Sequence, residues 1–365
     1  MFNFPTVKVL GASRPTILVQ GGMGVGISLS TLAGAVARRG GVGIVSFVAL
    51  DLIVGNRVGR ELSYFEAAKL EIEEAIRLSN GNGLIGINCM AILHSYEDSI
   101  RGAVAGGARA TFVGAGLPFS LPELVDRARE EAGITTDVAM VPIVSSVRAL
   151  DLICRRWKGR LPDAVVVEGP LAGGHLGFKE ADITNPAFAL EEIFGPIYEF
   201  SQRNGNFPII VAGGIWDRSD ICRWIDAGAA GVQMGTRFLA TFESGASEDF
   251  KKAVVAVESD GIIVAIDPGS PSGMPFRIIA NSAGYLEALL RKGSICRWQY
   301  MLHNKTCKAL ESTNAFCICK GLLTAIGIDP DLVDHPIFTV GINAARVKEI
   351  KSVDEVIDEL TGFSQ

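Results

Sequence analysis

The sequence predicts an α/β fold, a (β/α)8 TIM barrel followed by a small, mostly helical second domain. Short apolar runs rich in β-branched residues recur up to Gly235, and their starts lie 22 to 44 residues apart, which leaves room for a crossover helix each time. The runs are continuous in hydrophobicity rather than alternating, as expected of parallel strands that are buried on both faces. Eight such units favour a closed barrel, because a doubly wound open sheet more often stops at five or six strands.

The strands and helices of this barrel can be assigned along the chain. In chain order, the eight expected strands are Ile17–Gln20, Val42–Val45, Leu84–Asn88, Ala110–Val113, Val138–Pro142, Ala164–Glu168, Pro208–Ala212 and Ala230–Gly235. Helical periodicity is clearest in Tyr64–Ser79, where apolar residues recur at helical spacing from Phe65 to Ile76. This segment is therefore expected to be a helix with one buried stripe.

The pattern changes after Asp260. The stretch Asp267–Pro275 is rich in Pro, Gly and Ser and is expected to be an irregular loop. The helices expected after this loop are Ala283–Arg291, Trp298–Leu310, Phe316–Ile326 and Val353–Leu360. We therefore expect two domains, the barrel over residues 1–260 and, over residues 261–365, a helical cap domain with a closing C-terminal segment.

Composition narrows the classes of protein to consider. The 365 residues are 48% hydrophobic, enough for a large core, and 34 Lys and Arg against 40 Asp and Glu give a net charge of −6. No basic stripe is visible, so nucleic acid is not an expected partner. The N-terminus does not resemble a signal peptide and no apolar run approaches 18 residues, so we expect a cytoplasmic protein without a membrane partner. The oligomeric state is open, with a homodimer as one option.

Seven cysteines form an odd count, which suits reduced thiols. Four of them, Cys296, Cys307, Cys317 and Cys319, lie within 24 residues, but their spacing fits neither paired zinc knuckles nor iron–sulfur ligands. No metal is therefore expected, and buried structural thiols are favoured over a metal site or a redox-active pair. Cys89 is expected to be a small core residue.

The chain contains 42 glycines, where average usage of about 7% would give roughly 26. Barrel enzymes place their active sites at the carboxyl ends of the strands, and phosphate is often held after strands 7 and 8. Glycines there allow backbone N–H groups to surround phosphate oxygens, helped by a hydroxyl. The residues expected to do so are Gly213, Gly214, Gln233, Met234, Gly235 and Thr236.

The loop after the sixth expected strand holds the candidate catalytic residue, His175. It lies in the glycine-rich stretch Ala172–Gly177, and the chain has only four histidines. A histidine with an ordinary pKa of about 6.5 can exchange a proton at neutral pH. A structural role is expected for His94, His303 and His335.

Two further strand ends outline a site for a flat ring. The first expected strand runs into a loop with Gly22, Met23 and Gly24, whose backbone can lie along such a ring. The third ends at Asn88, whose amide can both donate and accept at a heterocycle edge. The one GxGxxG match, over residues 81–86, precedes a strand instead of following one, so a Rossmann dinucleotide site is not supported. A phosphorylated mononucleotide fits better.

Five motifs together carry a family resemblance, and in chain order they are Gln20–Gly24, Gly86–Asn88, Ala172–His175, Ala212–Ile215 and Gln233–Thr236. The chain resembles the nitronate monooxygenase family, formerly called 2-nitropropane dioxygenases, which also includes flavin-type enoyl-acyl-carrier-protein reductases. The resemblance spans about residues 15–280, and the segment Gly341–Arg346 is similar to the family's C-terminal return. Better-known nitronate oxidases tend to carry Ala-Pro before the strand-1 Met and Gln in the strand-6 loop, where this chain has Gly21-Gly22 and Glu168, which indicates a side branch.

The resemblance implies FMN as the cofactor of the barrel. By position, the implied cofactor-binding residues are Gly22, Met23, Gly24, Asn88, Glu168, Gly173, Gly174, Gly213, Gly214, Gln233, Met234, Gly235 and Thr236. It places Met23 and its neighbours against the isoalloxazine ring, and Asn88 and Glu168 at its polar edge or the ribityl chain. His175 would lie near flavin N5 and handle the substrate proton.

Three functions follow as hypotheses. The first is oxidation of alkyl nitronates with O₂ to a carbonyl compound and nitrite. The second is an NAD(P)H-dependent flavin reductase that acts on an enoyl thioester, a quinone or another acceptor, with the pyridine nucleotide docking transiently. The third is a barrel that binds a phosphorylated metabolite without redox chemistry.

Overall fold

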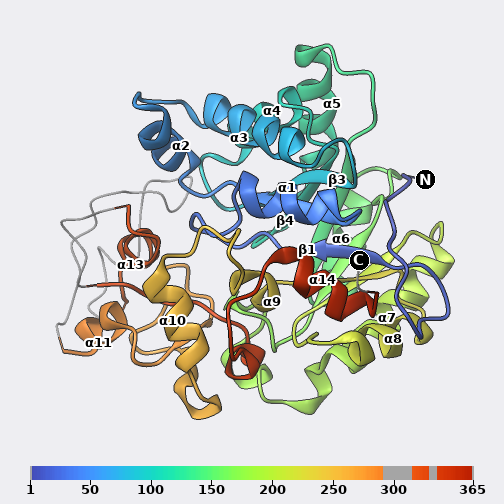
Figure 1. The fold of residues 1–365 in the computed structure, drawn as a ribbon. Helices are drawn as coiled ribbons and strands as arrows, with labels where there is room; N and C mark the ends of the chain where they lie inside the picture. The colour runs from blue at the N-terminus through green and yellow to red at the C-terminus, as the bar shows by residue number, and fades with distance from the viewer. Residues whose placement is uncertain (1, 291–314, 329–334, 364–365) are drawn as a thin grey trace.

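The computed structural model of the chain describes residues 2–290, 315–328 and 335–363. Eight parallel strands close into a barrel, because β9 pairs with β1 as well as with β8. Figure 1 shows the whole ribbon, coloured from the N-terminus to the C-terminus. The barrel strands are β1 (Ile17–Gln20), β2 (Val42–Ser46), β3 (Leu84–Met90), β4 (Ala110–Gly114), β5 (Ala139–Val144), β6 (Val165–Glu168), β8 (Ile209–Ala212) and β9 (Gly231–Met234). All eight predicted strands are confirmed, each within two residues at either end.

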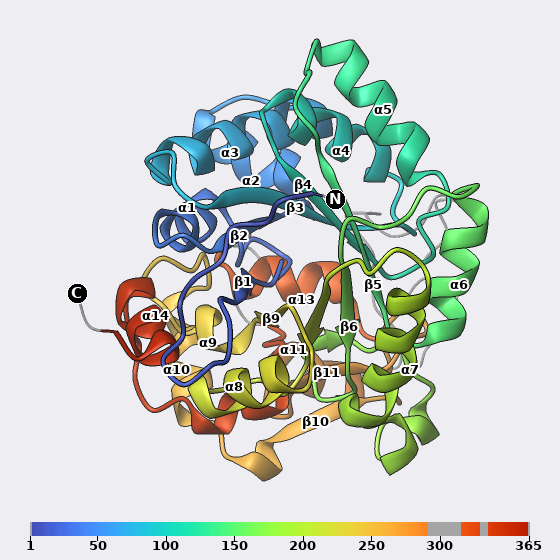
Figure 2. The same ribbon diagram turned by 90° about the vertical axis from the view of Figure 1, so that its right-hand side faces the viewer.

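Helices surround the barrel, and Figure 2 shows them outside the ring of strands. Those between barrel strands are α1 (Ser30–Arg38), α2 (Leu50–Val58), α3 (Tyr64–Leu78), α4 (Tyr96–Ala105), α5 (Leu121–Ala132), α6 (Val147–Arg156), α7 (Leu190–Arg203) and α8 (Arg218–Asp226). After β9 follow α9 (Thr236–Leu239), α10 (Glu248–Ala256), α11 (Ala283–Leu290), α13 (Ile318–Ala325) and α14 (Val353–Thr361). No helix in these described ranges is long and apolar enough to cross a bilayer.

Helix α3 illustrates how local sequence sets an element. Ser63 and Glu66 form a capping box at its N-terminus, which satisfies two backbone donors that the helix leaves open. The middle of its apolar stripe, Ala68, Ile72 and Ala75, is buried, while Phe65 and Ile76 at its ends are partly buried, and Glu71 is buried with it. The Glu71 carboxylate accepts from the backbone N–H of Ser30 at 2.6 Å and pairs with Arg57, so it caps the start of α1.

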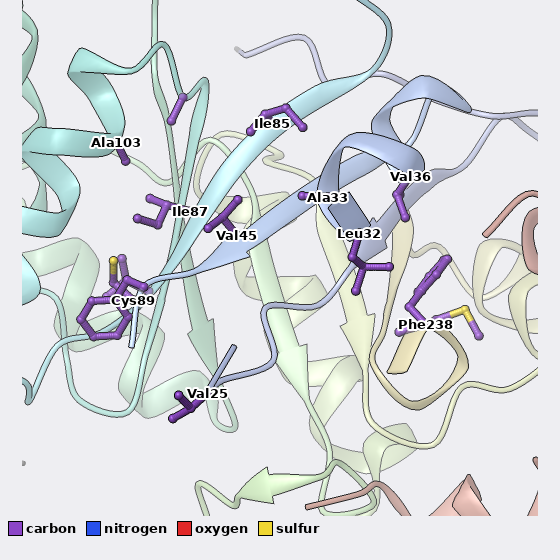
Figure 3. Packing of buried hydrophobic residues seen from close by; sticks show 14 of the residues in the cluster. Val25, Leu32, Ala33, Val36, Val45, Ile85, Ile87, Cys89, Ala103 and Phe238 are labelled. Carbon is purple, nitrogen blue, oxygen red and sulfur yellow. The ribbon is translucent and has the colours of Figure 1, made fainter. Parts of the chain in front are cut away.

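Two layers of apolar side chains hold the barrel together. Inside the ring, residues such as Val19, Ile44 and Phe112 form a separate buried cluster. Outside it, strand residues such as Val45 and Ile87 pack toward α1, α3 and α4 (Figure 3). These side chains are fully buried, so each contributes about 1.5–3 kcal/mol of transfer free energy.

The segment after the barrel contains a sheet that the sequence did not predict. Strands β10 (Ile262–Ala265) and β11 (Phe276–Ile279) pair antiparallel, and β11 also pairs with the two-residue strand β7 (Gly174–His175). This sheet joins the strand-6 loop to a segment about 100 residues further along the chain. The loop expected at 267–275 connects β10 to β11.

The helices that the sequence predicts after this loop can be compared with the structure. Those over 283–291, 316–326 and 353–360 are confirmed as α11, α13 and α14. The helix expected at 298–310 lies outside the described residues. The division of the chain into two domains at residue 260 remains a prediction.

Candidate active site

A cavity of about 470 Å³ lies at the carboxyl ends of the barrel strands. This is the size of a cofactor or substrate site. All fourteen residues expected from the sequence to form the site line it, namely Gly22, Met23, Gly24, Asn88, Glu168, Gly173, Gly174, His175, Gly213, Gly214, Gln233, Met234, Gly235 and Thr236. The structure therefore brings together residues that are up to 214 positions apart, while their individual roles remain predictions.

The loop after β1 is held by buried polar side chains. The Gln20 amide donates to the Ser28 hydroxyl at 2.8 Å, and its carbonyl oxygen accepts from the backbone N–H of Ile44 at 3.0 Å. The Ser28 hydroxyl in turn accepts from the backbone N–H of Met23 at 2.9 Å. Gly22 sits so close to Asn88 that a Cβ would lie 2.2 Å from the Asn88 Cβ. Only glycine fits there, which keeps this part of the cavity wall flat.

The loops after β8 and β9 form a cradle built from backbone. Gly213 and Gly214 have φ values of +90° and +89°, which favour glycine. Within the described part of the chain, the backbone N–H groups of Gly214 and Gly235 have no hydrogen-bond acceptor. The Thr236 hydroxyl accepts from the backbone N–H of Gly341 at 3.1 Å, so its own hydrogen stays available to a ligand. Such a group of open donors suits an anion.

Asn88 is oriented by β4. Its side-chain Nδ2 donates to the backbone carbonyl of Phe112 at 3.2 Å. Among the described residues nothing donates to its carbonyl oxygen Oδ1, which makes this atom the free acceptor of the side chain at the cavity. It is suited to receive a ring N–H.

Two ionisable side chains line the cavity at the end of β6 and in the loop after it, and burial shifts the pKa of both. Burial raises the pKa of Glu168 to about 7, and no hydrogen-bond partner for its carboxyl occurs in the described ranges. Burial lowers the pKa of His175 to about 4, so this histidine is neutral at neutral pH. The sequence could not indicate this shift from the ordinary histidine pKa, because it carries no measure of how far the fold removes the ring from water.

The position of His175 is fixed from two sides. It pairs with Phe276 across the β7–β11 ladder, and the two rings lie 4.7 Å apart in an edge arrangement. Its Nε2 lies 3.1 Å from the hydroxyl oxygen of Ser270, a buried residue of the β10–β11 loop. On strand β11, the buried Arg277 donates to the carbonyls of Pro170, at 2.8 Å, and Ala172, which clamps the loop that carries His175.

Several functional residues were not assigned from the sequence. Ser270 lies in the stretch that the sequence predicts as an irregular loop, and nothing in the sequence pattern around Arg277 indicates its contacts. Asn343 lines the cavity and donates to the backbone carbonyl of Gly214 at 2.8 Å, which supports the cradle from the far end of the chain. Its sequence signal was the Gly341–Arg346 segment, which the family resemblance marked without a function.

The remaining histidines and cysteines that the structure describes mostly lie away from the cavity. His94 is 2.9 Å from the Tyr64 hydroxyl, and His335 is 2.6 Å from the Glu287 carboxylate. Cys317 is buried, and Cys319 is buried where α13 lines the cavity. His303, Cys296 and Cys307 lie outside the described residues, so the role of the four-cysteine group stays a prediction.

Cys89 is fully buried beside Ile87 (Figure 3). Burial raises its pKa well above the ordinary value, which keeps the thiol protonated. The prediction that Cys89 is a small core residue is confirmed.

Comparisons with known proteins identify relatives of this chain. One relative comes from Mycobacterium tuberculosis and is named (3aS,4S,5R,7aS)-5-hydroxy-7a-methyl-1-oxo-octahydro-1H-indene-4-carboxyl-CoA dehydrogenase. It is 26% identical to this chain over 311 residues, which cover 81% of this chain and 75% of the relative. A probable nitronate monooxygenase from Staphylococcus saprophyticus is 26% identical over 284 residues, which cover 70% of this chain and 74% of that protein.

Solved structures share the fold. The nitroalkane oxidase from Streptomyces ansochromogenes has a TM-score of 0.66 at 17% identity, covering 95% of each chain. FabK from Thermotoga maritima has a TM-score of 0.60 at 22% identity, covering 94% of this chain and 91% of that one. A family model described as nitronate monooxygenase matches residues 65–362. The chain therefore belongs to the nitronate monooxygenase family of flavin oxidoreductases.

Proposed function

We propose that this protein is an FMN-dependent oxidoreductase that oxidises alkyl nitronates with O₂ to a carbonyl compound and nitrite. One observation carries the proposal: a single cavity joins a cradle of open backbone donors to a wall with two ionisable groups, Glu168 and His175. The cradle suits the phosphate of a mononucleotide, and the wall suits proton handling at a bound substrate.

The residues present fit FMN. The open N–H groups of Gly214 and Gly235 and the free hydroxyl hydrogen of Thr236 would hold the single phosphate. The flat wall at Gly22 leaves room for a planar ring, and the free acceptor of Asn88 would meet an N–H at its edge. None of the described cavity-lining residues is a Lys or Arg, so the phosphate would be held by dipoles rather than by a cation.

Bound there, FMN would supply the ring that accepts electrons from the substrate and passes them to O₂. The chain's own residues supply position and proton transfer. His175, neutral at neutral pH, has a ring nitrogen free to accept a proton from the α-carbon of a neutral nitroalkane or to hydrogen-bond a nitronate. Glu168 is neutral below about pH 7, where it does not repel an anionic substrate.

A second candidate function is reduction or oxidation of an acyl thioester by the same cofactor. The observation in its favour is an apolar part of the cavity lining, formed by Met90 at the end of β3, by Leu93 just after it, and by Ile318 and Leu322 of α13. This apolar lining suits a hydrocarbon arm. The relative from Mycobacterium tuberculosis is named a carboxyl-CoA dehydrogenase, which agrees in substrate type.

The visible spectrum of the purified protein is the first test. Flavin bands, with FMN identified by chromatography after denaturation, are the expected result, and a colourless preparation that takes up no FMN would favour a non-redox barrel. O₂ uptake with propionate 3-nitronate or ethylnitronate then tests the reaction. An FMN-loaded sample that is inactive on nitronates but is reduced by NADPH or NADH would instead support the thioester or quinone reductase.

A further inference from the structure

Three side chains form a hydrogen-bonded row that leads away from the cavity. The row begins at His175, whose Nε2 lies 3.1 Å from the Ser270 hydroxyl oxygen. Ser270 is only 5% exposed, and its hydroxyl oxygen lies 2.9 Å from that of Ser272. Ser272 is partly exposed and precedes the exposed Gly273 at the tip of the β10–β11 loop. The row thus connects the cavity to the surface.

The donors and acceptors along this row can be counted. The Ser270 hydroxyl oxygen accepts from the backbone N–H of Ser272 at 3.3 Å, and the Ser272 hydroxyl oxygen accepts from that of Met274 at 3.2 Å. Each hydroxyl then retains one hydrogen to donate and one lone pair to accept with. The row can therefore point either way, toward His175 Nε2 or away from it.

The other ring nitrogen of His175, Nδ1, is the second point at which the ring can exchange a proton. Among the described residues, His175 Nδ1 has no hydrogen-bond partner, and His175 lines the cavity. When Nε2 carries the hydrogen and donates to Ser270, Nδ1 holds a lone pair available to a substrate in the cavity.

We propose that Ser270 and Ser272 form a proton relay that links His175 to solvent. The relay rests on the proposed function only in that a proton is exchanged with a substrate at His175. Ser270 acts as a positioning and relay residue, since it bonds the imidazole and does not itself contact the reacting atoms.

Each proton in this relay can be followed from its donor to its acceptor. The substrate C–H bond breaks, its electron pair stays with the substrate carbon, and the proton bonds to His175 Nδ1. The Nε2 proton passes to Ser270, the Ser270 proton to Ser272, and the Ser272 proton to water. One proton has moved from substrate to solvent, and His175 is neutral again with its hydrogen on Nδ1. In reverse, the same row delivers a proton to a substrate that is being reduced.

The setting of His175 explains why such a row is useful. A partly buried imidazole that is removed from water and has no carboxylate partner among the described residues holds a positive charge poorly. Passing a proton out through Nε2 as another arrives at Nδ1 avoids a lasting imidazolium. The relay thus lets the neutral His175 ring act as a base.

Kinetics of serine variants test the relay. We expect Ser270→Ala to lower kcat by about tenfold or more, though less than the roughly 10²- to 10⁴-fold cost of losing a general base. Ser272→Ala keeps the Ser270 contact with His175 and should still lower kcat, while Ser270→Thr should restore most of it. A solvent deuterium isotope effect on the wild type, smaller in both Ala variants, is the accompanying result.

A readout that needs no turnover is the tautomer of His175, measured by ¹⁵N NMR on histidine-labelled protein and assigned with His175→Gln. Both Ser270→Ala and Ser272→Ala should change the balance between Nδ1–H and Nε2–H forms. The matched control is Ser282→Ala, because Ser282 is equally buried and donates to the Ile279 carbonyl at 2.6 Å, away from the row. It should leave the His175 resonances unchanged.

Two outcomes overturn the relay. If Ser272→Ala matches the wild type in kcat and in the His175 tautomer, Ser270 only positions the ring. If Ser270→Ala leaves the tautomer unchanged, the row is not coupled to His175 at all. A failure of the proposed function would give a different result, because turnover would then be insensitive to His175→Ala. The NMR comparison would still show whether the serines are coupled to His175.

Discussion

The cavity is lined by two sets of loops that follow neighbouring barrel strands and present different chemical groups. After β8 and β9, Gly214, Gly235 and Thr236 present backbone N–H groups and one hydroxyl, without any charged side chain in the described lining there. At the end of β6 and in the loop after it, Glu168 and His175 present ionisable groups whose pKa values burial has moved toward the neutral forms. The first set is suited to hold an anion at any pH, and the second to exchange protons.

This difference separates binding from chemistry. A change at the glycine cradle should weaken cofactor affinity and leave the rate per bound cofactor nearly intact. A change in the second set should do the reverse. Four substitutions, taken from the largest expected effect to the smallest, test whether the two sets are independent.

Replacing His175 is the strongest test of the second set. We expect His175→Ala to lower kcat by about 10²- to 10⁴-fold, because it removes the group that handles the substrate proton. FMN content per protein should stay at the wild-type level. His94→Ala is the control, since His94 contacts Tyr64 outside the cavity, and it should keep full turnover. Unchanged turnover in His175→Ala would remove this histidine from the mechanism.

Replacing Gly214 tests the cradle. Gly214→Ala places a side chain at a φ of +89°, a strain of about 1–3 kcal/mol that the loop relieves by leaving its binding conformation. We expect the Kd for FMN to rise by about tenfold with kcat of the loaded enzyme little changed. The control is Gly159→Ala, which has a φ of +91° and open space around it. It should lower the Tm similarly but keep the FMN affinity, and an equal loss of affinity in both would contradict the cradle.

Asn343 tests support of the cradle from the end of the chain. Asn343→Ala removes the 2.8 Å hydrogen bond to the Gly214 carbonyl. A hydrogen bond is worth about 1 kcal/mol, so FMN titration should give about fivefold weaker binding. Asn204→Ala removes a bond of the same length to the Phe200 carbonyl on the surface and should not affect FMN binding. Equal affinity of Asn343→Ala and the wild type would show that the cradle holds its shape alone.

Glu168 gives the smallest effect and one that depends on pH. Its pKa is raised to about 7, so the carboxyl is neutral below that pH and anionic above it. We expect the KM for a nitronate anion to rise severalfold, about 1 kcal/mol of repulsion, as the pH passes through 7. Glu168→Gln should flatten this rise. A neutral nitroalkane is the internal control, because its KM should not follow the charge on Glu168.

Much of the barrel could be predicted because its strands are continuous apolar runs. Val165–Val167 and Ile209–Ala212 are fully buried stretches of such runs, and such runs have few alternatives in a chain of this length. Helix α3 was predictable from its stripe and cap. The glycines at the strand ends could be assigned to a site because the barrel rule states where strand ends meet.

The sheet of β7, β10 and β11 could not be predicted for a physical reason. Strand β7 is two residues long, and its pairing with β11 joins segments about 100 residues apart in a stretch rich in Gly, Pro and Ser. No local pattern records such a contact. The contact of Ser270 with His175 depends on this sheet, and so does the shifted pKa of His175. Neither could therefore be predicted from the sequence.

The register between Gly174–His175 and Phe276–Arg277 also bears on how this enzyme can change. The barrel supplies the proposed anion cradle, whereas the hairpin that follows it supplies the Ser270 contact of His175, the proposed base, and the Arg277 clamp on the His175 loop. Exchanging residues 262–279 between relatives would exchange the proton chemistry while leaving cofactor retention in place. The hairpin can therefore differ between relatives, and the reactivity with it, while the barrel stays the same.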